Sequence, residues 1–408
     1  MNTIEIFGPF KQIVTMDNLP GYGPLNDEML DIIYDGGIRV LNGVILEIGP
    51  YHQIKQNNDK PIALPNPSIV VPGFVDAHTH MLWAGSRAND YAKRLSGVSY
   101  QEIAANGGGI LDTVNHTRKA SSHELETILL KHAEKHFNRG ITTCEVKSGY
   151  GLNVADELKM LQVINNVNDK INQTLIPTCL AAHTIPWEFN NPEKYLNHLI
   201  EELLPEVKER NLSQRIDIFV EEEAFPCELA QKYLMKSKEL GFTTCVHADQ
   251  FTRGGSSIAS QVGSVSADHL EQSTSDDIVN MKKHNVTPIV LPGASLGLGM
   301  PFAPARKMLD EGLPLVLASD WNPGSAPQGD LLMQAAILGA SEKLTIAETL
   351  ASITCRPAKV LGYNDRGTIK PGFRADFAIY PTRSFQDIVY FQGSLHPFKV
   401  FANGHNFC

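Results

Sequence analysis

Eight β-rich runs alternate with helical patterns along most of this chain, and that alternation limits the possible folds more than any other feature. Such alternation is typical of parallel β/α units, in which a helix connects each strand to the next. Eight units are the number that closes a barrel. We therefore expect an α/β protein with a (β/α)₈ barrel over residues 69–355. Its expected strands are Ile69–His78, Ile141–Lys147, Leu175–His183, Ile216–Glu222, Phe242–His247, Ser264–His269, Val286–Leu291 and Pro314–Asp320.

Both ends of the chain read as short strands instead. Asn42–Gly43 lies between two apolar runs, and Asn403–Gly404 follows another one. The Asn-Gly pair adopts positive φ readily and is a strong hairpin signal. We expect residues 1–68 and 356–408 to form a small β-sandwich domain together.

Composition narrows the class of protein. With 42% hydrophobic and 20% charged residues over 408 positions, the chain can bury a large core. Its net charge of -10 disfavours nucleic acid as a partner, because phosphate would be repelled. No apolar stretch reaches the length of a membrane span, and no secretory signal is visible at the first residues. We expect a cytoplasmic homodimer with no membrane partner.

The most informative short motif is Asp76-Ala-His-Thr-His80, at the end of the first expected strand. Residues i and i+2 of a strand face the same side, so His78 and His80 can both bind one metal ion. The His-x-His pattern alone is weak and often structural. Its position at the carboxyl end of a barrel strand, where barrel enzymes keep their active sites, favours function.

Other expected strands end in the same chemistry. A single histidine in an apolar strand is usually a core residue whose nitrogens are hydrogen-bonded. Polar groups at several strand ends of one barrel are hard to explain in that way, because burying each of them costs free energy. The pattern therefore predicts a metal site. These strand-end residues are His183, His247, His269 and Asp320.

Longer motifs extend the pattern along nearly the whole chain. Val71–His80, the later histidines, Asp320 and Gly367–Phe377 resemble the amidohydrolase superfamily. Four further segments resemble one branch of it, which hydrolyses the cyclic amide 4-imidazolone-5-propanoate to N-formimidoyl-L-glutamate in histidine degradation. These segments are Gly85–Asp90, Ser99–Ile110, Glu145–Gly151 and Asp320–Ser325.

This resemblance implies roles for individual residues. It implies one zinc or iron(III) ion per subunit, held by His78, His80, His247 and Asp320. It also implies that the substrate contacts Arg87, Tyr150, His183, Gln250 and Ser325, and that the product contacts Tyr150, Asn322 and Gly324. We further expect Asp320 to move a proton and His269 to orient water or stabilise the oxyanion.

The residue types agree with that chemistry. Three imidazoles and one carboxylate leave room for water at a metal, as in catalytic sites. Arg87 offers a guanidinium fork to a propanoate, although a surface arginine is the alternative. Tyr150 could instead be a packing residue. Gln250 cannot exchange a proton at ordinary pH.

Three other features have simpler interpretations. Lys147 could bridge two metals, as a modified lysine does in related enzymes, but we expect a single metal. Glu221–Glu223 reads as a solvated strand end or helix start, although its place at the rim leaves a second role open. Gly107–Gly109 lacks the context of a phosphate loop and is expected to form a flexible lid.

Two rival functions stay open. An aminohydrolase that deaminates a purine or pyrimidine would use similar ligands and would release ammonia. A non-enzymatic scaffold with this fold would lack metal ligands, and none of the four is missing from the sequence.

Overall fold

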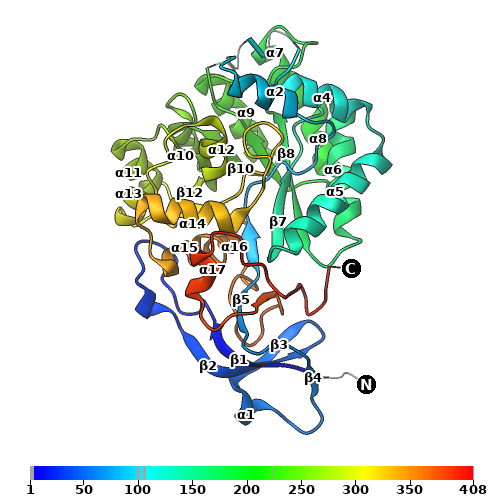
Figure 1. The fold of residues 1–408 in the computed structure, drawn as a ribbon. Coiled ribbons are helices and arrows are strands. Elements are labelled where there is room, and N and C mark those ends of the chain that lie inside the picture. Colours follow the sequence, from blue (N-terminus) through cyan, green and yellow to red (C-terminus); the bar gives the residue numbers. More distant parts are fainter. Residues whose placement is uncertain (1–3, 99–101, 104–106, 223, 408) are drawn as a thin grey trace.

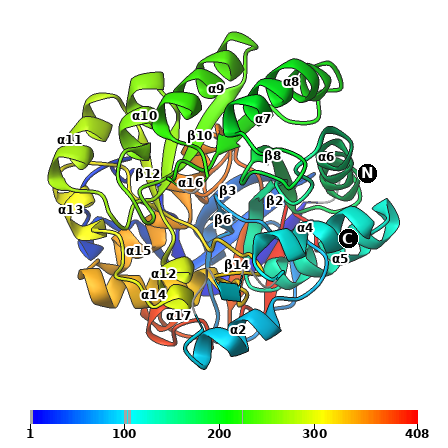
Figure 2. The same cartoon turned by 90° about the horizontal axis from the view of Figure 1, so that it is seen from above.

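The larger part of the molecule is a closed barrel of eight parallel strands. The computed structural model describes residues 4–98, 102–103, 107–222 and 224–407. Neighbouring strands pair in chain order, and a bridge between Thr79 and Trp321 joins the last to the first. Figure 2 looks down this barrel, with the helices around it. The (β/α)₈ expectation is confirmed. The strands are β6 (Phe74–Asp76), β7 (Ile141–Lys147), β8 (Thr174–Ala182), β9 (Arg215–Ile218), β10 (Thr243–Ala248), β11 (Ser266–His269), β12 (Thr287–Val290) and β13 (Val316–Leu317).

The first expected strand, Ile69–His78, is not continuous, and that prediction is wrong. Its first half is β5 (Ile69–Pro72), which pairs with strands of the smaller sheet, and the barrel strand β6 begins at Phe74. Between them, a Cβ on Gly73 would lie 2.2 Å from Oγ1 of Thr142. A residue without a side chain is needed where the chain crosses this closely from one sheet to the other.

Helices surround the barrel in roughly the order in which they occur along the chain (Figure 2). Helix α5 (Ser122–Phe137) illustrates their sequence logic: Ser121 and Glu124 form a capping box, and Leu125, Leu129 and Ala133 are buried on one face. Among the described helices, none is long and apolar enough to cross a membrane. The others around the barrel are α2 (Ala88–Leu95), α4 (Ile110–Lys119), α6 (Val154–Asn168), α7 (Pro192–His198), a π-helical turn (Leu199–Leu203), α8 (Leu204–Glu209), α9 (Cys227–Glu239), α10 (Gly255–Val262), α11 (Ser275–Lys283), α12 (Pro292–Leu298), α13 (Ala305–Asp310), α14 (Leu331–Glu342), α15 (Ile346–Ser352) and α16 (Cys355–Val360).

The smaller part is built from both chain ends, as expected. Its seven strands form one mixed sheet that curls, so that the Phe7 ring lies 5.1 Å from Phe377 and 4.9 Å from Phe401. The sandwich-like core therefore lies between two halves of one sheet. Asn42 and Gly43 have positive φ in the turn between β2 and β3, which confirms the hairpin. The elements are β1 (Glu5–Val14), a 3₁₀ turn (Asp27–Met29), β2 (Ile32–Leu41), β3 (Val44–Pro50), α1 (Tyr51–Ile54), β4 (Lys60–Ile62), β5, β14 (Phe377–Tyr380) and β15 (Lys399–Phe401). Helix α17 (Gln386–Tyr390), between β14 and β15, contacts α14 and α15 of the barrel instead.

The domain boundaries, 1–68 with 356–408 against 69–355, stay a proposal. Sheet membership favours moving the first boundary to follow Pro72, because β5 lies in the small sheet. Helix α16 contacts β6 and β13, so the second boundary is better placed after Val360.

Candidate metal centre

Three imidazoles and one carboxylate converge at the carboxyl ends of the barrel strands. His78 and His80 follow β6, and His247 lies in β10. Nε2 of His80 lies 3.3 Å from Nε2 of His78 and 3.3 Å from Nε2 of His247. Oδ1 of Asp320, which follows β13, lies 3.6 Å from Nε2 of His78 and 3.4 Å from Nε2 of His80. All four residues are buried.

These distances fit ligands of one metal ion. A tetrahedral site with bonds of about 2.0–2.1 Å separates neighbouring ligand atoms by about 3.3–3.4 Å. At this distance, the facing nitrogen atoms of two neutral imidazoles repel each other through their lone pairs. A shared proton or a cation between them removes this repulsion. The set of donors, with its single carboxylate, therefore suits a divalent or trivalent cation.

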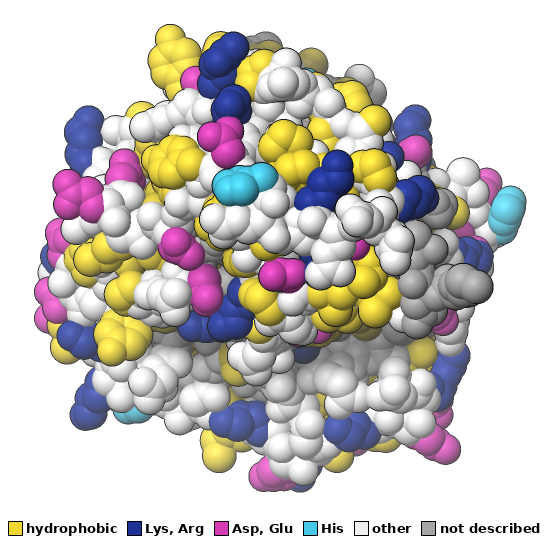
Figure 3. All heavy atoms as spheres, turned by 90° about the horizontal axis from the view of Figure 1, so that it is seen from below, with side chains coloured by type: hydrophobic (Ala, Val, Ile, Leu, Met, Phe, Trp, Pro, Cys, Tyr) yellow, Lys and Arg dark blue, Asp and Glu magenta, His cyan; other side chains and the backbone are white. Residues whose placement is uncertain are grey.

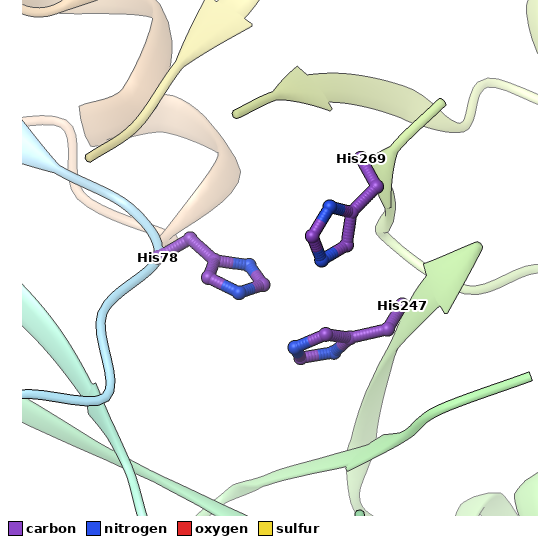
Figure 4. Close-up of side chains that lie close together, drawn as sticks. All are labelled: His78, His247 and His269. Atoms are coloured by element: carbon purple, nitrogen blue, oxygen red, sulfur yellow. The ribbon is translucent and has the colours of Figure 1, made fainter. Parts of the chain in front are cut away.

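His269 lies beside the same cluster. Figure 4 shows its ring and those of His78 and His247 pointing toward one another from three strands or strand ends. The ring centroids of His269 and His247 are 5.4 Å apart, and one ligand atom from each of these three histidines fits within 4.8 Å of the others. His269 is thus within reach of a metal or of what binds to one, and its catalytic role stays a prediction.

Two buried carboxylates lie behind the imidazoles. Oδ2 of Asp268 is 2.6 Å from Nδ1 of His78, and Oδ2 of Asp217 is 2.9 Å from Nδ1 of His247. A carboxylate at the far nitrogen fixes the ring so that Nε2 faces the metal. The sequence interpretation missed both residues, although a charged residue within a buried barrel strand was a visible signal.

The protonation states suit metal binding. Burial lowers the pKa of His78, His80 and His247, so these imidazoles are neutral, the form that coordinates metals. Burial also lowers the pKa of His269, but the interaction with the Glu271 carboxylate, 3.7 Å from its Nδ1, outweighs burial and raises that pKa above its usual value. Burial raises the pKa of Asp320.

Asp320 is held in an uncommon backbone conformation. Its φ is 48° and that of His269 is 88°, both in a region that non-glycine residues rarely adopt. The Asp320 N–H donates to the carbonyl of His78 at 3.0 Å, which fixes the carboxylate beside the imidazoles. Such strain at a site is typical of a functional constraint.

The loop after Asp320 is organised around its carboxylate. The Asn322 amide donates to Oδ2 of Asp320 at 2.9 Å, and the Ser325 hydroxyl lies 3.4 Å from the same oxygen. Oδ1 of Asn322 accepts from the backbone N–H groups of Gly324 and Ser325, each at 2.8 Å. The three expected ligand-contact residues of this loop therefore lie next to the cluster.

Tyr150 and His183 form one wall of the site. The His183 ring stacks on His80 at 5.1 Å, and Tyr150 lies 5.6 Å from His183 and 6.1 Å from His80. Nδ1 of His183 donates to the Gly149 carbonyl at 3.0 Å, which leaves Nε2 as the nitrogen without a proton. Both rings are positioned to contact a planar ligand.

Arg87 approaches the site from the N-terminus of α2. Its Nε donates to Asp90, and its Nη1 lies 3.7 Å from where a Cβ on Gly324 would be. Asp90 also accepts from the Gly109 N–H at 2.9 Å, and a Cβ on Gly108 would lie 2.6 Å from its Oδ1. Gly108 and Gly109 are thus packed against Asp90, whereas the lid was expected to be loose. Part of the Ser99–Ile110 motif, residues 99–101 and 104–106, lies outside the described residues.

Lys147 forms ion pairs with two buried carboxylates. Nζ of Lys147 lies 2.7 Å from Oε1 of Glu145 and 2.8 Å from Oδ2 of Asp217. Those charges outweigh burial and raise the pKa of Lys147, which keeps the amine protonated and argues against a metal bridge.

The expectation of a solvated Glu221 is wrong. Its side chain is buried and accepts the backbone N–H groups of Gln250 and Phe251, at 3.1 and 2.9 Å, which shapes the turn after β10. Glu222 is exposed as expected, and Glu223 lies outside the described residues. Gln250, expected to contact the substrate, is buried two residues past the end of β10.

A (β/α)₈ barrel with histidine and carboxylate donors converging at the carboxyl ends of its strands is the architecture of the metal-dependent barrel hydrolases. Comparison with known proteins agrees, because the sequence profile of the amidohydrolase family matches residues 69–406. The chain belongs to the amidohydrolase family and, within it, to the imidazolonepropionases.

Two relatives carry that second assignment. The imidazolonepropionase of Solibacter usitatus is 39% identical over 391 residues, 94% of this chain and 93% of the relative. That of Caldanaerobacter subterraneus subsp. tengcongensis is 40% identical over 331 residues, 80% of each chain. The family and the convergent donors together support a metal cofactor and a small-molecule substrate.

Solved structures share the fold at low identity. Guanine deaminase from C. acetobutylicum, with bound guanine, superposes with a TM-score of 0.68 at 15% identity and covers 100% of both chains. A triazine hydrolase from Arthobacter aurescens gives a TM-score of 0.74 at 14% identity, covering 99% of this chain and 94% of its own. At these identities the likeness concerns the fold alone.

Proposed function

We propose that this chain hydrolyses the ring C–N bond of 4-imidazolone-5-propanoate to give N-formimidoyl-L-glutamate, in histidine degradation. The observation that carries the proposal is the set of imidazole nitrogens of His78, His80 and His247 at 3.3 Å separations beside Asp320, in a chain about 40% identical to imidazolonepropionases.

We assign one zinc or iron(III) ion per subunit to His78, His80, His247 and Asp320. The 3.3–3.6 Å separations of their facing atoms support this set of four. Bound there, such an ion would lower the pKa of a water molecule toward neutrality and polarise the ring carbonyl. Asp217 and Asp268 orient two of the imidazoles for this purpose.

Binding of the substrate is assigned to residues around the cluster. Arg87 would hold the propanoate, since a guanidinium matches a carboxylate with two parallel hydrogen bonds. His183 and Tyr150 would face the planar ring, and their 5.6 Å ring separation supports a common surface. Gln250, Asn322, Gly324 and Ser325 complete the proposed contacts with substrate and product.

Proton transfer is assigned to Asp320. Its carboxylate lies at the metal cluster and can pass a proton from water to the ring nitrogen that leaves. His269 would stabilise the negative charge that develops on the ring oxygen, which its position beside His78 and His247 supports. Gln250 can donate and accept hydrogen bonds there but cannot exchange a proton at ordinary pH.

We also propose a homodimer and a cytoplasmic location. Size-exclusion chromatography with light scattering would give the mass in solution. Fractionation of the source cells would locate the protein.

The decisive functional experiment combines metal analysis with a ring-opening assay on enzymatically generated imidazolone propanoate. We expect metal-dependent loss of the imidazolone absorbance and formation of N-formimidoyl-L-glutamate without ammonia. Ammonia release from a purine or pyrimidine, with no ring opening, would identify an aminohydrolase instead. Lack of any turnover by metal-loaded protein would favour a scaffold without catalysis.

A further inference from the structure

A pocket lies at the end of the barrel opposite the metal cluster. Its volume is about 600 Å³. Thr287 and Pro314, which line it, lie at the start of β12 and just before β13, whereas His247 and Asp320 lie at the carboxyl ends. Gly21 and Tyr22, from the segment between β1 and β2, form another wall. In Figure 1 this blue segment reaches the lower side of the barrel near α13.

Arg356, in α16, is a buried cation whose hydrogen-bonding capacity is only partly used. It is 2% exposed, and its Nη2 donates to the Gly23 carbonyl at 2.7 Å. Its Nε and Nη1 are buried, and neither has a hydrogen-bond partner among the described residues. Buried donors without a partner cost free energy and are rare in folded proteins.

No carboxylate within the described residues compensates this guanidinium directly. Glu348 acts on it through space, but its carboxylate is bound by Arg306 at 2.9 Å. Burial outweighs the charge of Glu348 and lowers the pKa of Arg356. An anion bound in the pocket would therefore offset the free energy cost of burying the uncompensated charge of Arg356.

Two lysines add positive charge to the same pocket. Nζ of Lys359 lies 3.1 Å from where a Cβ on Gly21 would be, and Nζ of Lys282 lies 3.6 Å from the same point on Gly312. Both glycines line the pocket, so both ammonium groups lie at its wall. Together with Arg356 they make three cations, and the lining residues include no aspartate or glutamate.

This concentration of charge contrasts with the rest of the molecule. The chain carries a net charge of -10. On the face seen in Figure 3, basic and acidic side chains are interspersed. A local cluster of one sign in an otherwise acidic protein creates a potential that attracts ions of the opposite charge.

We infer that this pocket binds a small oxyanion with two negative charges, either a phosphate group or a dicarboxylate. Nη2 of Arg356 has a second N–H besides the one that Gly23 accepts, and together with the unpartnered Nε or Nη1 on the same edge it can donate two parallel hydrogen bonds to adjacent oxygens of such an anion. Lys282 and Lys359 would neutralise the remaining charge. This site is separate from the proposed substrate site and does not depend on the proposed reaction.

The test is calorimetric titration of the metal-loaded protein with inorganic phosphate and with succinate at constant ionic strength. We expect one saturable site per chain for at least one anion. The exposed pair Lys282→Gln/Lys359→Gln should weaken binding at least tenfold without loss of fold. Arg356→Gln should weaken it further. Lys283→Gln is the matched control, since Lys283 is the exposed neighbour of Lys282 and does not line the pocket.

The relative affinities distinguish the two sources: tighter phosphate binding indicates a phosphate group, and tighter succinate binding a dicarboxylate. Binding of neither anion would overturn the inference. So would undiminished binding in the double lysine variant, because that result would place the anion elsewhere, such as at the metal. If Arg356→Gln does not fold, the anion affinity of the double lysine variant decides whether the anion binds in this pocket.

Discussion

Oδ2 of Asp217 lies 2.9 Å from Nδ1 of His247, so the imidazole is oriented by a carboxylate on the neighbouring barrel strand. The same oxygen lies 2.8 Å from Nζ of Lys147. Burial raises the pKa of Asp217, but the interactions with His247 and Lys147 outweigh burial and lower that pKa, so the carboxyl stays ionised. The position of one expected metal ligand depends on an ion pair beneath it.

Asp217→Asn should weaken metal binding by about 10- to 100-fold, because the amide cannot orient and polarise His247 as the carboxylate does. Competition with a metal-buffering chelator measures this affinity. Asp169→Asn, an exposed change at the end of α6, is the control. Unchanged affinity in a folded Asp217→Asn protein would show that this contact does not support the metal site.

The sequence predicted the barrel and the strand-end histidines because both leave local patterns: alternating runs, and His-x-His at a strand end. It did not predict the roles of Asp217 and Asp268. Their contacts depend on how the strands are arranged: β9 lies beside β10 and brings Asp217 to His247, whereas Asp268 of β11 contacts His78, which follows β6. The break at Gly73 was also missed, because the apolar run from Ile69 to Val75 continues through the change of sheet.

Arg87→Lys should raise KM by about tenfold with little change in kcat. Lysine keeps the charge but loses the fork that would hold a carboxylate and also the Nε contact with Asp90. Steady-state kinetics measure both constants, and the exposed Arg383→Lys is the control. A KM equal to that of the wild type would remove Arg87 from propanoate binding.

Asp320→Asn should reduce kcat by about 10²- to 10⁴-fold even at matched metal occupancy, since a proton-transfer group is lost. Gln250→Glu should mainly change substrate binding. Both are compared across pH after loading with the same metal. A fully active Asp320→Asn protein, or a collapse of kcat in Gln250→Glu with normal binding, would move the proton chemistry away from Asp320.

Acid should destabilise the fold partly through His136. Burial lowers the pKa of His136 to about 3, and its Nε2 donates to the Gly329 carbonyl at 3.0 Å. Between its unfolded pKa of about 6.5 and about 3, the unfolded chain binds the extra proton, so stability falls as pH falls through this window. Thermal midpoints of wild type and His136→Gln should therefore approach each other from pH 7 to pH 5. A difference between the two thermal midpoints that stays constant or widens as the pH falls would contradict this role of His136.

Elemental analysis of purified wild type, His78→Ala, His247→Ala and His183→Ala, with ring-opening activity measured on the same samples, tests the metal site and its role in hydrolysis most directly. We predict one metal per chain in the wild type and in His183→Ala. His78→Ala and His247→Ala should lose metal and activity together while circular dichroism shows an intact barrel, because each change removes a ligand and little core volume. Full metal occupancy with full activity in either of these two variants would contradict the assignment of the metal site.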